Sequence, residues 1–165
     1  MVCDILKLRR FIETSANVIE GHGLPPMAGR VIGALMVCTP PYLSHDEMAA
    51  RLGASKGSIS MTTQLLVQLG LVERMSLPGK RPHYYRLREA LWSDLLTTGR
   101  EQVQKHLEMV EEGLALLEGE PVEAKMRLIE LQIFADFLLE MLPEMADRWE
   151  HRRSVLMEKR LAEAS

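Results

Sequence analysis

The sequence predicts a mainly α-helical fold that contains one small β-hairpin. Good helix formers such as Leu, Met, Ala and Glu are frequent, whereas the aromatic residues that favour strands make up only 5% of the chain. Glycine- and proline-rich breaks divide the first part of the chain into short segments, and the later part has nearly continuous helical periodicity. These observations predict a compact N-terminal domain, residues 1–88, followed by a long helical arm, residues 89–165.

Two helices are expected at the start of the chain. Apolar residues between Ile5 and Ile19 recur at helical spacing, which predicts a helix over residues 4–20. A run of glycine and proline then interrupts the pattern. Residues 27–38 are mostly apolar, so they predict a short, buried helix that ends before Pro40.

Residues 44–70 have the pattern of a helix-turn-helix. Ser44 and Glu47 predict a capping box, in which each side chain bonds the other residue's backbone N–H, so a helix should begin here. Gly53 begins a three-residue turn, and Ser55 is placed to cap a second helix. Two short helices joined by a short turn with a glycine are typical of this motif.

A β-hairpin is expected directly after the second helix of the motif. Residues 71–75 and 83–87 both have the composition of strands. The segment between them contains the proline and glycine of a turn and two cations, Lys80 and Arg81. A hairpin in this position is a wing, so the N-terminal domain is predicted to be a winged helix-turn-helix.

Positive charge is concentrated in this part of the chain. The whole chain has a formal net charge of −3. Residues 51–88, however, hold seven Lys or Arg and one Glu, a net charge of +6, whereas residues 89–165 have a net charge of −8. A polyanion would therefore meet one strongly basic section on an otherwise acidic protein.

The second helix of the motif, residues 55–69, predicts an inner and an outer face. Ile59, Thr63, Leu66 and Leu69 recur at helical spacing and would hold the helix against the domain. The other residues of its first half are small, polar or basic. They lie toward the end of a recognition helix that enters the major groove of DNA.

A basic hairpin tip suits the minor groove of DNA, where negative potential concentrates and a guanidinium fits well. We therefore predict that the domain binds double-stranded DNA. The candidate contact residues of the helix and the wing are Ser55, Lys56, Gly57, Ser58, Ser60, Met61, Thr62, Gln64, Arg74, Lys80 and Arg81.

The segment 89–165 predicts a helical dimerisation arm. Apolar side chains from Val103 to Leu117 step by four and three residues, a heptad spacing that needs a partner helix. A break at residues 118–121 ends this helix, and Pro143 suits the first position of a third one. The broad apolar face of the middle helix predicts a homodimer, and we expect the N-terminal helix to join its interface.

Four short motifs stand out within residues 11–88: GLP at 23–25, AGRVIG at 28–33, SKGSISM at 55–61 and GLV at 70–72. Together they resemble the MarR family of transcription regulators, and its GbsR-like branch most closely. The resemblance implies a symmetric dimer with a winged helix on each protomer, palindromic operators, control by a small molecule, and repression more often than activation. Many family members have Arg where this chain has Met61, so their base contact at that position is not carried over.

A small-molecule effector would need an adaptable apolar cavity, which we expect where the winged helix meets the arm. Methionine and aromatic side chains commonly line such cavities. The alternative for each candidate is a place in the core or in the dimer interface. The candidate lining residues are Trp92, Phe134, Phe137 and Trp149.

Two other functions remain open. Winged helices also serve as protein-binding adaptors, although an adaptor has no need of the cations at the wing. A metal- or thiol-sensing repressor would keep the DNA role and change only the signal, and Cys3 and Cys38 are the candidate thiols. The five His residues lack metal-binding spacing, so we assign no metal and no cofactor.

Enzymatic and membrane functions are not expected. The sequence contains no nucleophile elbow, phosphate-binding loop or dinucleotide-binding fingerprint, so we predict that the protein is not an enzyme. No stretch approaches 18 uninterrupted apolar residues, and the two cysteines form no disulfide pattern. We therefore expect a cytoplasmic protein with no membrane partner.

Overall fold

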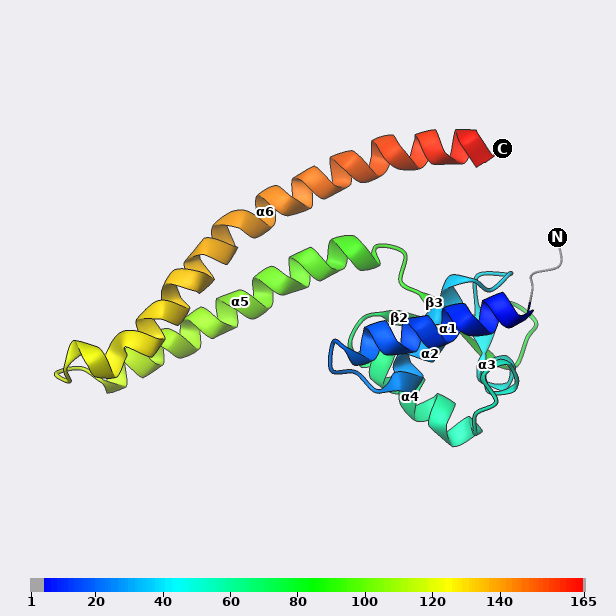
Figure 1. Ribbon diagram of the computed structural model, residues 1–165, viewed down its shortest axis with the longest axis horizontal. Helices are drawn as coiled ribbons and strands as arrows, with labels where there is room; N and C mark the ends of the chain where they lie inside the picture. Colours follow the sequence, from blue (N-terminus) through cyan, green and yellow to red (C-terminus); the bar gives the residue numbers. More distant parts are fainter. Residues whose placement is uncertain (1–4, 165) are drawn as a thin grey trace. The chain divides into compact units, whose positions relative to one another are not determined.

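The computed structural model describes residues 5–164, which form two compact units that meet in the sequence at Leu91 (Figure 1). We call them the N-terminal unit and the C-terminal unit. The fold is mainly helical with one small antiparallel sheet, which confirms the predicted fold class. DNA binding by residues 1–88 and dimerisation through residues 89–165 stay predictions.

The N-terminal unit contains four helices and three strands among its described residues. Its first helix, α1, packs along α2, and the helix-turn-helix and the sheet follow. The elements are α1 Ile5–Glu20, α2 Pro26–Met36, β1 Leu43–Ser44, α3 His45–Leu52, α4 Lys56–Gln68, β2 Val72–Ser76 and β3 His83–Leu87.

Two glycines of α2 allow α1 and α2 to approach each other closely. A Cβ at Gly29 would lie 2.5 Å from the Cα of Ala16 and 2.6 Å from the carbonyl oxygen of Ser15. A Cβ at Gly33 would lie 2.8 Å from the side chain of Ser15. Real Cβ atoms do not sit this close to other atoms, so position 29 requires a residue without a side chain, and a side chain at position 33 would displace that of Ser15. The backbones of the two helices are therefore in direct contact.

The core of the N-terminal unit lies between α2, the helix-turn-helix and the sheet. Met48 of α3, Ile59 and Leu66 of α4 and Val31 of α2 are fully buried and belong to one apolar cluster. Val72 at the start of β2 joins the same cluster. This shared core fixes α4 relative to the rest of the unit.

The local signals of the helix-turn-helix are confirmed. The Ser44 hydroxyl accepts a hydrogen bond from the Glu47 N–H (3.3 Å), and the Ser44 N–H donates to Glu47 Oε2 (2.7 Å), as in a capping box. Gly53 ends α3 in the left-handed conformation, with φ of 62°. The Ser55 hydroxyl accepts from the Ser58 N–H (3.2 Å) and so caps α4.

The sheet contains one strand that the sequence did not predict. Its order is β1-β3-β2, and both pairings are antiparallel. The missed strand, β1, has only two residues, with Leu43 opposite Tyr85 and Ser44 opposite Tyr84. The predicted hairpin of β2 and β3 is present, and Gly79 in its connection has a φ of 75°.

The C-terminal unit contains two long helices, α5 Leu91–Leu116 and α6 Val122–Ala164. The break between them includes Gly119, with φ of 85°. Leu128 of α6 lies against Gly113 of α5, 2.9 Å from where its Cβ would be, and Val110 is fully buried. Part of the predicted heptad seam of α5 is thus covered by α6 of the same chain.

The predicted third helix of the arm is wrong, because α6 continues through Pro143 without a break. Proline inside a helix costs about 3 kcal/mol, since its ring removes one backbone hydrogen bond and crowds the preceding turn. The residues on both sides of Pro143 include good helix formers, such as Leu138, Leu139 and Met145, so both segments favour helix. Figure 1 shows that α6 is bent and not straight.

None of the helices within residues 5–164 combines the length and the apolar character that crossing a membrane would require.

Candidate nucleic-acid interface

Helix α4 has one buried and one exposed face. Ile59, Thr63 and Leu66 are buried, as predicted. The expected outward orientation of Thr62 is wrong, since this residue is only 8% exposed. Position 62 follows 59 by three residues and precedes 66 by four, so Thr62 lies on the same inner face. Leu69 was predicted to point inward but is 48% exposed, because α4 ends at Gln68 and Leu69 is its C-cap.

The exposed face of α4 holds most of the predicted contact residues. Met61, at the centre of this face, is 74% exposed. Ser58 is half-buried, and the remaining helix candidates on this face are Ser55, Lys56, Gly57, Ser60 and Gln64, all exposed. Small and polar side chains thus surround one long apolar side chain, a surface that fits the edges of base pairs.

Lys56, the first residue of α4, has an ion-pair partner that sequence reasoning missed. Its Nζ lies 2.7 Å from Oδ1 of Asp46, in the first turn of α3. Both side chains are largely exposed. The free backbone N–H groups at the start of α4 and the Lys56 ammonium both attract anions, whereas Asp46 repels them. A phosphate at this end of α4 would compete with Asp46 for Lys56.

A histidine connects α3, α4 and the sheet. The His45 ring stacks on Tyr85 of β3, with ring centroids 4.5 Å apart. Its Nε2 lies 2.8 Å from the Thr63 hydroxyl, which itself donates to the carbonyl of Ile59 (2.9 Å). Because that hydroxyl has a single hydrogen, His45 Nε2–H must be the donor to Thr63. His45 therefore helps to fix the buried face of α4.

The stability of the N-terminal unit should fall in mild acid through His45. Burial lowers the pKa of His45 from 6.5; nearby Arg74 and His83 lower it further, and Asp46 opposes them. The folded state thus favours the neutral ring, so this stabilisation is present above pH 6.5 and is lost as the pH falls below it. In urea unfolding at a series of pH values, His45→Gln should show a weaker pH dependence than wild type between pH 7 and 5.

The matched control for this experiment is His22→Gln, which changes a histidine on the surface beyond the end of α1. It should keep the wild-type pH dependence. An equal slope for wild type and His45→Gln would contradict the role given to His45.

The wing carries three exposed cations. Lys80 Nζ lies 5.8 Å from the centroid of the Tyr84 ring, and Arg81 is exposed beside it. Arg74 donates to His83 Nε2 across the hairpin (2.7 Å). Arg86, by contrast, pairs with Glu73 (2.5 Å) and Glu89 (2.7 Å), so its charge is neutralised within the unit. Arg74, Lys80 and Arg81 are the wing cations that the structure presents to solvent.

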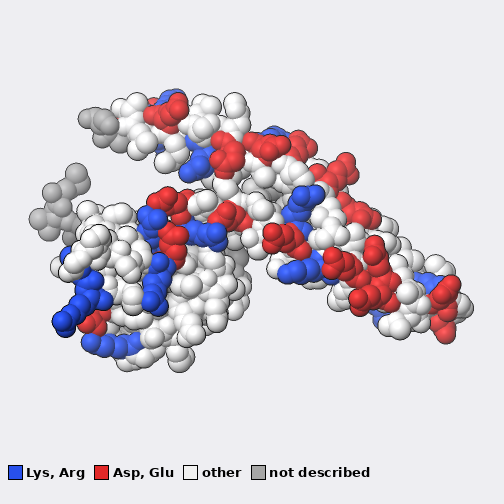
Figure 2. Space-filling model, turned by 180° about the vertical axis from the view of Figure 1, so that it is seen from behind, with Lys and Arg blue, Asp and Glu red and all other residues white. Residues whose placement is uncertain are grey.

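The charges of the two units differ. In Figure 2 the visible face of the N-terminal unit is mostly uncharged, with several Lys and Arg and some Asp and Glu, whereas Asp and Glu are frequent along the helices of the C-terminal unit. This agrees with the net charge of +6 over residues 51–88 and −8 over residues 89–165. A polyanion is attracted to the first unit and repelled by the second.

The predicted effector residues all lie in the C-terminal unit. Trp92 of α5 and Phe134 and Phe137 of α6 are each about half exposed. Trp149 is half-buried and donates its indole N–H to the Ser93 hydroxyl (3.1 Å). These positions do not test the predicted pocket, which stays a prediction.

Of the two candidate sensor thiols, only Cys38 lies within the described residues. Cys38 is buried, and this burial raises the pKa of its thiol, so the reactive thiolate is disfavoured. Cys3 lies outside the described residues. Within residues 5–164 the structure contains no group of three or more metal-binding side chains.

Comparison with known proteins gives consistent matches for both units. A family model described as the MarR family matches residues 22–81, and one described as "MmpR5-like MarR family transcriptional regulator" matches residues 90–152. The "HTH-type transcriptional regulator MmpR5" of Mycobacterium tuberculosis (strain ATCC 25618 / H37Rv) is 30% identical over 148 residues, 88% of each chain. A solved structure titled "Crystal Structure of a transcriptional regulator" has a TM-score of 0.75 and 28% identity, over 88% of this chain and 99% of that one.

Proposed function

Because this chain belongs to the MarR family of DNA-binding transcriptional regulators, we propose that it is a homodimeric repressor that binds palindromic operators. The observation that carries the proposal is that one unit presents both an exposed polar face on α4 and exposed cations on the wing. The GbsR-like branch stays a prediction that these matches do not test. The family also gives no support to the protein-binding adaptor or to an enzyme.

In the proposed complex, α4 enters the major groove. Gln64 is suited to pair with adenine, and Met61 to contact a thymine methyl group. Ser55, Ser58 and Ser60 offer hydroxyls to phosphates or base edges, and the N-terminus of α4 favours a phosphate. Thr62 has no part in this interface because its side chain is buried.

The wing is proposed to contact the adjacent minor groove and backbone. Lys80 and Arg81 sit in the connection of the hairpin, where a narrow loop can enter the groove. Arg74 lies on β2 and is placed for the phosphate backbone. These contacts position the protein, whereas α4 reads the sequence.

A second copy of the chain is the proposed partner of the apolar face of α6. Val122, Met126, Ile133 and Phe137 are all more than half exposed and recur at intervals of four and seven residues. A stripe of large apolar side chains of this kind is costly in water and marks an interface. On α1, Ile5 and Leu6 are also largely exposed, which supports a contribution of α1 to the same dimer.

Control by a small molecule is part of the proposal, with Trp92, Phe134, Phe137 and Trp149 as the predicted lining of its site. Phe134 borders a shallow hollow of about 360 Å³ together with Arg127, Glu130 and Leu131 of α6. A thiol signal through Cys38 is disfavoured by its burial. We propose a cytoplasmic location, where such a regulator meets DNA.

The test of this function is the selection of bound duplexes from a random DNA pool. We expect an enriched palindrome whose half-sites are centred about one helical turn, 34–36 Å, apart. Sedimentation of the complex should give two chains per duplex. Enrichment of non-palindromic DNA, or a one-to-one complex, would contradict the dimer, and no enrichment would contradict sequence-specific binding. Transcription in vitro from a promoter that contains the selected site should fall when the protein is added.

Removing the carboxylate of Asp46 should strengthen DNA binding. Asp46 holds Lys56 and adds negative charge beside the start of α4. In Asp46→Asn the lysine is free to pair with a phosphate, and affinity for the selected duplex should rise about two- to fivefold, as expected for an exposed ion pair. Fluorescence anisotropy titrations measure this affinity. Glu20→Gln, which removes one acidic charge at the far end of α1, is the control and should change affinity less.

A further inference from the structure

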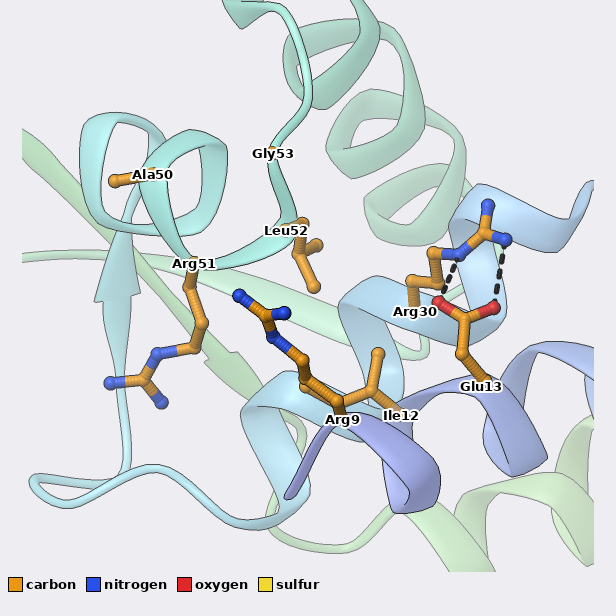
Figure 3. Close-up of a pocket in the computed structure, with 8 residues that line it drawn as sticks. All are labelled: Arg9, Ile12, Glu13, Arg30, Ala50, Arg51, Leu52 and Gly53. Carbon is orange, nitrogen blue, oxygen red and sulfur yellow. Dashed lines mark hydrogen bonds and ion pairs between the residues drawn. The ribbon is translucent and has the colours of Figure 1, made fainter. Parts of the chain in front are cut away.

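A hollow of about 290 Å³ opens on the N-terminal unit, and none of its lining residues is among those assigned to DNA (Figure 3). Its walls come from the first half of α1, from α2 and from the end of α3 with the turn that follows it. The apolar side chains of Ile12 and Leu52 line part of it. Three arginines also line it: Arg9, Arg30 and Arg51. We call it the arginine hollow.

One wall of the arginine hollow is neutral and fixed. Arg30 donates two hydrogen bonds to Glu13, from Nε to Oε1 (2.9 Å) and from a terminal nitrogen to Oε2 (2.8 Å). The hydrogen bond from Arg30 lowers the pKa of Glu13, so the pair stays ionised in the physiological range. This two-point geometry holds both side chains in place across α1 and α2.

The other two arginines bring positive charge that is not neutralised by an ion pair, although Glu47 lies close enough to Arg51 for its carboxylate to be stabilised by that charge. Within residues 5–164 the structure shows no carboxylate paired with Arg9 or Arg51, whereas Glu13 neutralises Arg30. In Figure 3 the Arg9 side chain extends across the opening toward Leu52 and Arg51. The guanidinium of Arg51 lies to one side of the opening and points away from Arg9. To bind the same anion as Arg9, it would have to adopt another rotamer. Two like charges repel here, and an anion between them would replace repulsion by attraction.

The charge and the size of the hollow indicate the class of ligand. Its lining carries a net charge of +2, from Arg9 and Arg51, and a guanidinium binds phosphate oxygens in pairs. A phosphate monoester has a charge of about −1.5 to −2 near pH 7, whereas each phosphate of DNA has a single charge. The apolar contacts of Ile12 and Leu52 suit a short carbon chain on the ester.

We propose that the arginine hollow binds a small phosphate monoester. Arg9 and Arg51 hold the phosphate, the Arg30–Glu13 pair forms the rigid wall beside it, and Ile12 and Leu52 contact the organic part. Its lining residues belong to the N-terminal unit, whereas the predicted effector residues all belong to the C-terminal unit. Ligand binding here does not depend on the proposed DNA-binding function.

The test is isothermal titration of the full chain with glycerol phosphate, in a chloride buffer without DNA and at constant ionic strength. Wild type should bind it with one site per chain. The double variant Arg9→Gln/Arg51→Gln should bind at least tenfold more weakly. Arg10→Gln removes the neighbouring charge of α1, which does not line the hollow, and should bind as wild type does. Because Arg9 and Arg51 are exposed, the double variant should keep its unfolding midpoint in chloride.

A DNA titration separates the two sources of phosphate. With random duplex in phosphate-free buffer, the affinity of Arg9→Gln should equal that of Arg10→Gln if the hollow serves a free ligand. The proposal is overturned if wild type does not bind glycerol phosphate, or if Arg10→Gln loses binding as much as the double variant does. It is also overturned if the double variant binds the ester as wild type does while Arg9→Gln weakens DNA binding, because the guanidinium would then serve the DNA backbone.

Discussion

Replacing Lys80 and Arg81 together by alanine should weaken binding to the selected duplex about 10- to 100-fold at physiological salt, as expected when two phosphate contacts are lost. Both cations are exposed in the connection of the β2–β3 hairpin. The slope of log affinity against log salt should fall by about 2, because each lost contact releases about one counterion fewer. Anisotropy titrations at four salt concentrations measure both quantities.

The control for the wing variant is Arg152→Ala/Arg153→Ala, which removes two positive charges from α6 of the C-terminal unit. It should leave the salt slope unchanged. A repeated selection with the wing variant should return the same bases at the positions read by α4, since the wing cations contact mainly backbone and minor groove. An unchanged affinity of the wing variant would refute the assignment of the wing to DNA.

Gly29→Ala should lower the free energy of unfolding of the N-terminal unit by about 3 kcal/mol or more, the upper range for overpacking. The new Cβ would meet the backbone of α1 at 2.5 and 2.6 Å, and backbone atoms cannot rotate away as a side chain can. The two helices would have to separate, which opens the core beneath them. Urea unfolding followed by circular dichroism measures the loss.

Two further glycine variants keep this prediction testable if Gly29→Ala does not fold. Gly33→Ala meets only the side chain of Ser15 within 3 Å, so it should lose less stability. At Gly57 the nearest atom to a new Cβ is the Ser55 hydroxyl oxygen at 4.0 Å, so Gly57→Ala should be as stable as wild type or slightly more so. Equal stability of Gly29→Ala and Gly57→Ala would show that α1 and α2 are not in backbone contact.

The features that the sequence predicted depend on residues near one another in the chain. The capping box of Ser44 and Glu47 spans three residues, and the cap of Ser55 lies directly before its helix. The apolar spacing of Ile59, Thr63 and Leu66 reports the buried face of α4 directly. Short-range hydrogen bonds and helical periodicity carry enough information to define such elements without knowledge of the fold.

The features that the sequence did not predict depend on tertiary contacts. Strand β1 has two residues and exists only because β3, about forty residues later, pairs with it. Thr62 is polar, so its burial follows from the packing of α4 and not from its residue type. Pro143 lies inside a helix because of the residues around it.

The candidate sites follow the same division. The exposed face of α4 and the wing cations were predictable, because each lies within one continuous segment. The Lys56–Asp46 pair joins residues ten positions apart on two helices, and His45 meets Thr63 and Tyr85 across three elements. The arginine hollow combines residues of α1, α2 and α3, so no pattern within one segment of the sequence predicts it.

Pro143 gives α6 a built-in point of low bending stiffness. A proline has no N–H to donate to the carbonyl four residues earlier, here that of Leu139. One backbone hydrogen bond is therefore missing near the middle of this 43-residue helix. Thermal bending of a helix concentrates where its backbone hydrogen bonds are interrupted. The segments before and after Pro143 therefore behave as two stiff rods joined by a compliant joint, and a load applied to one end of α6 changes the angle at this joint before it disturbs either rod.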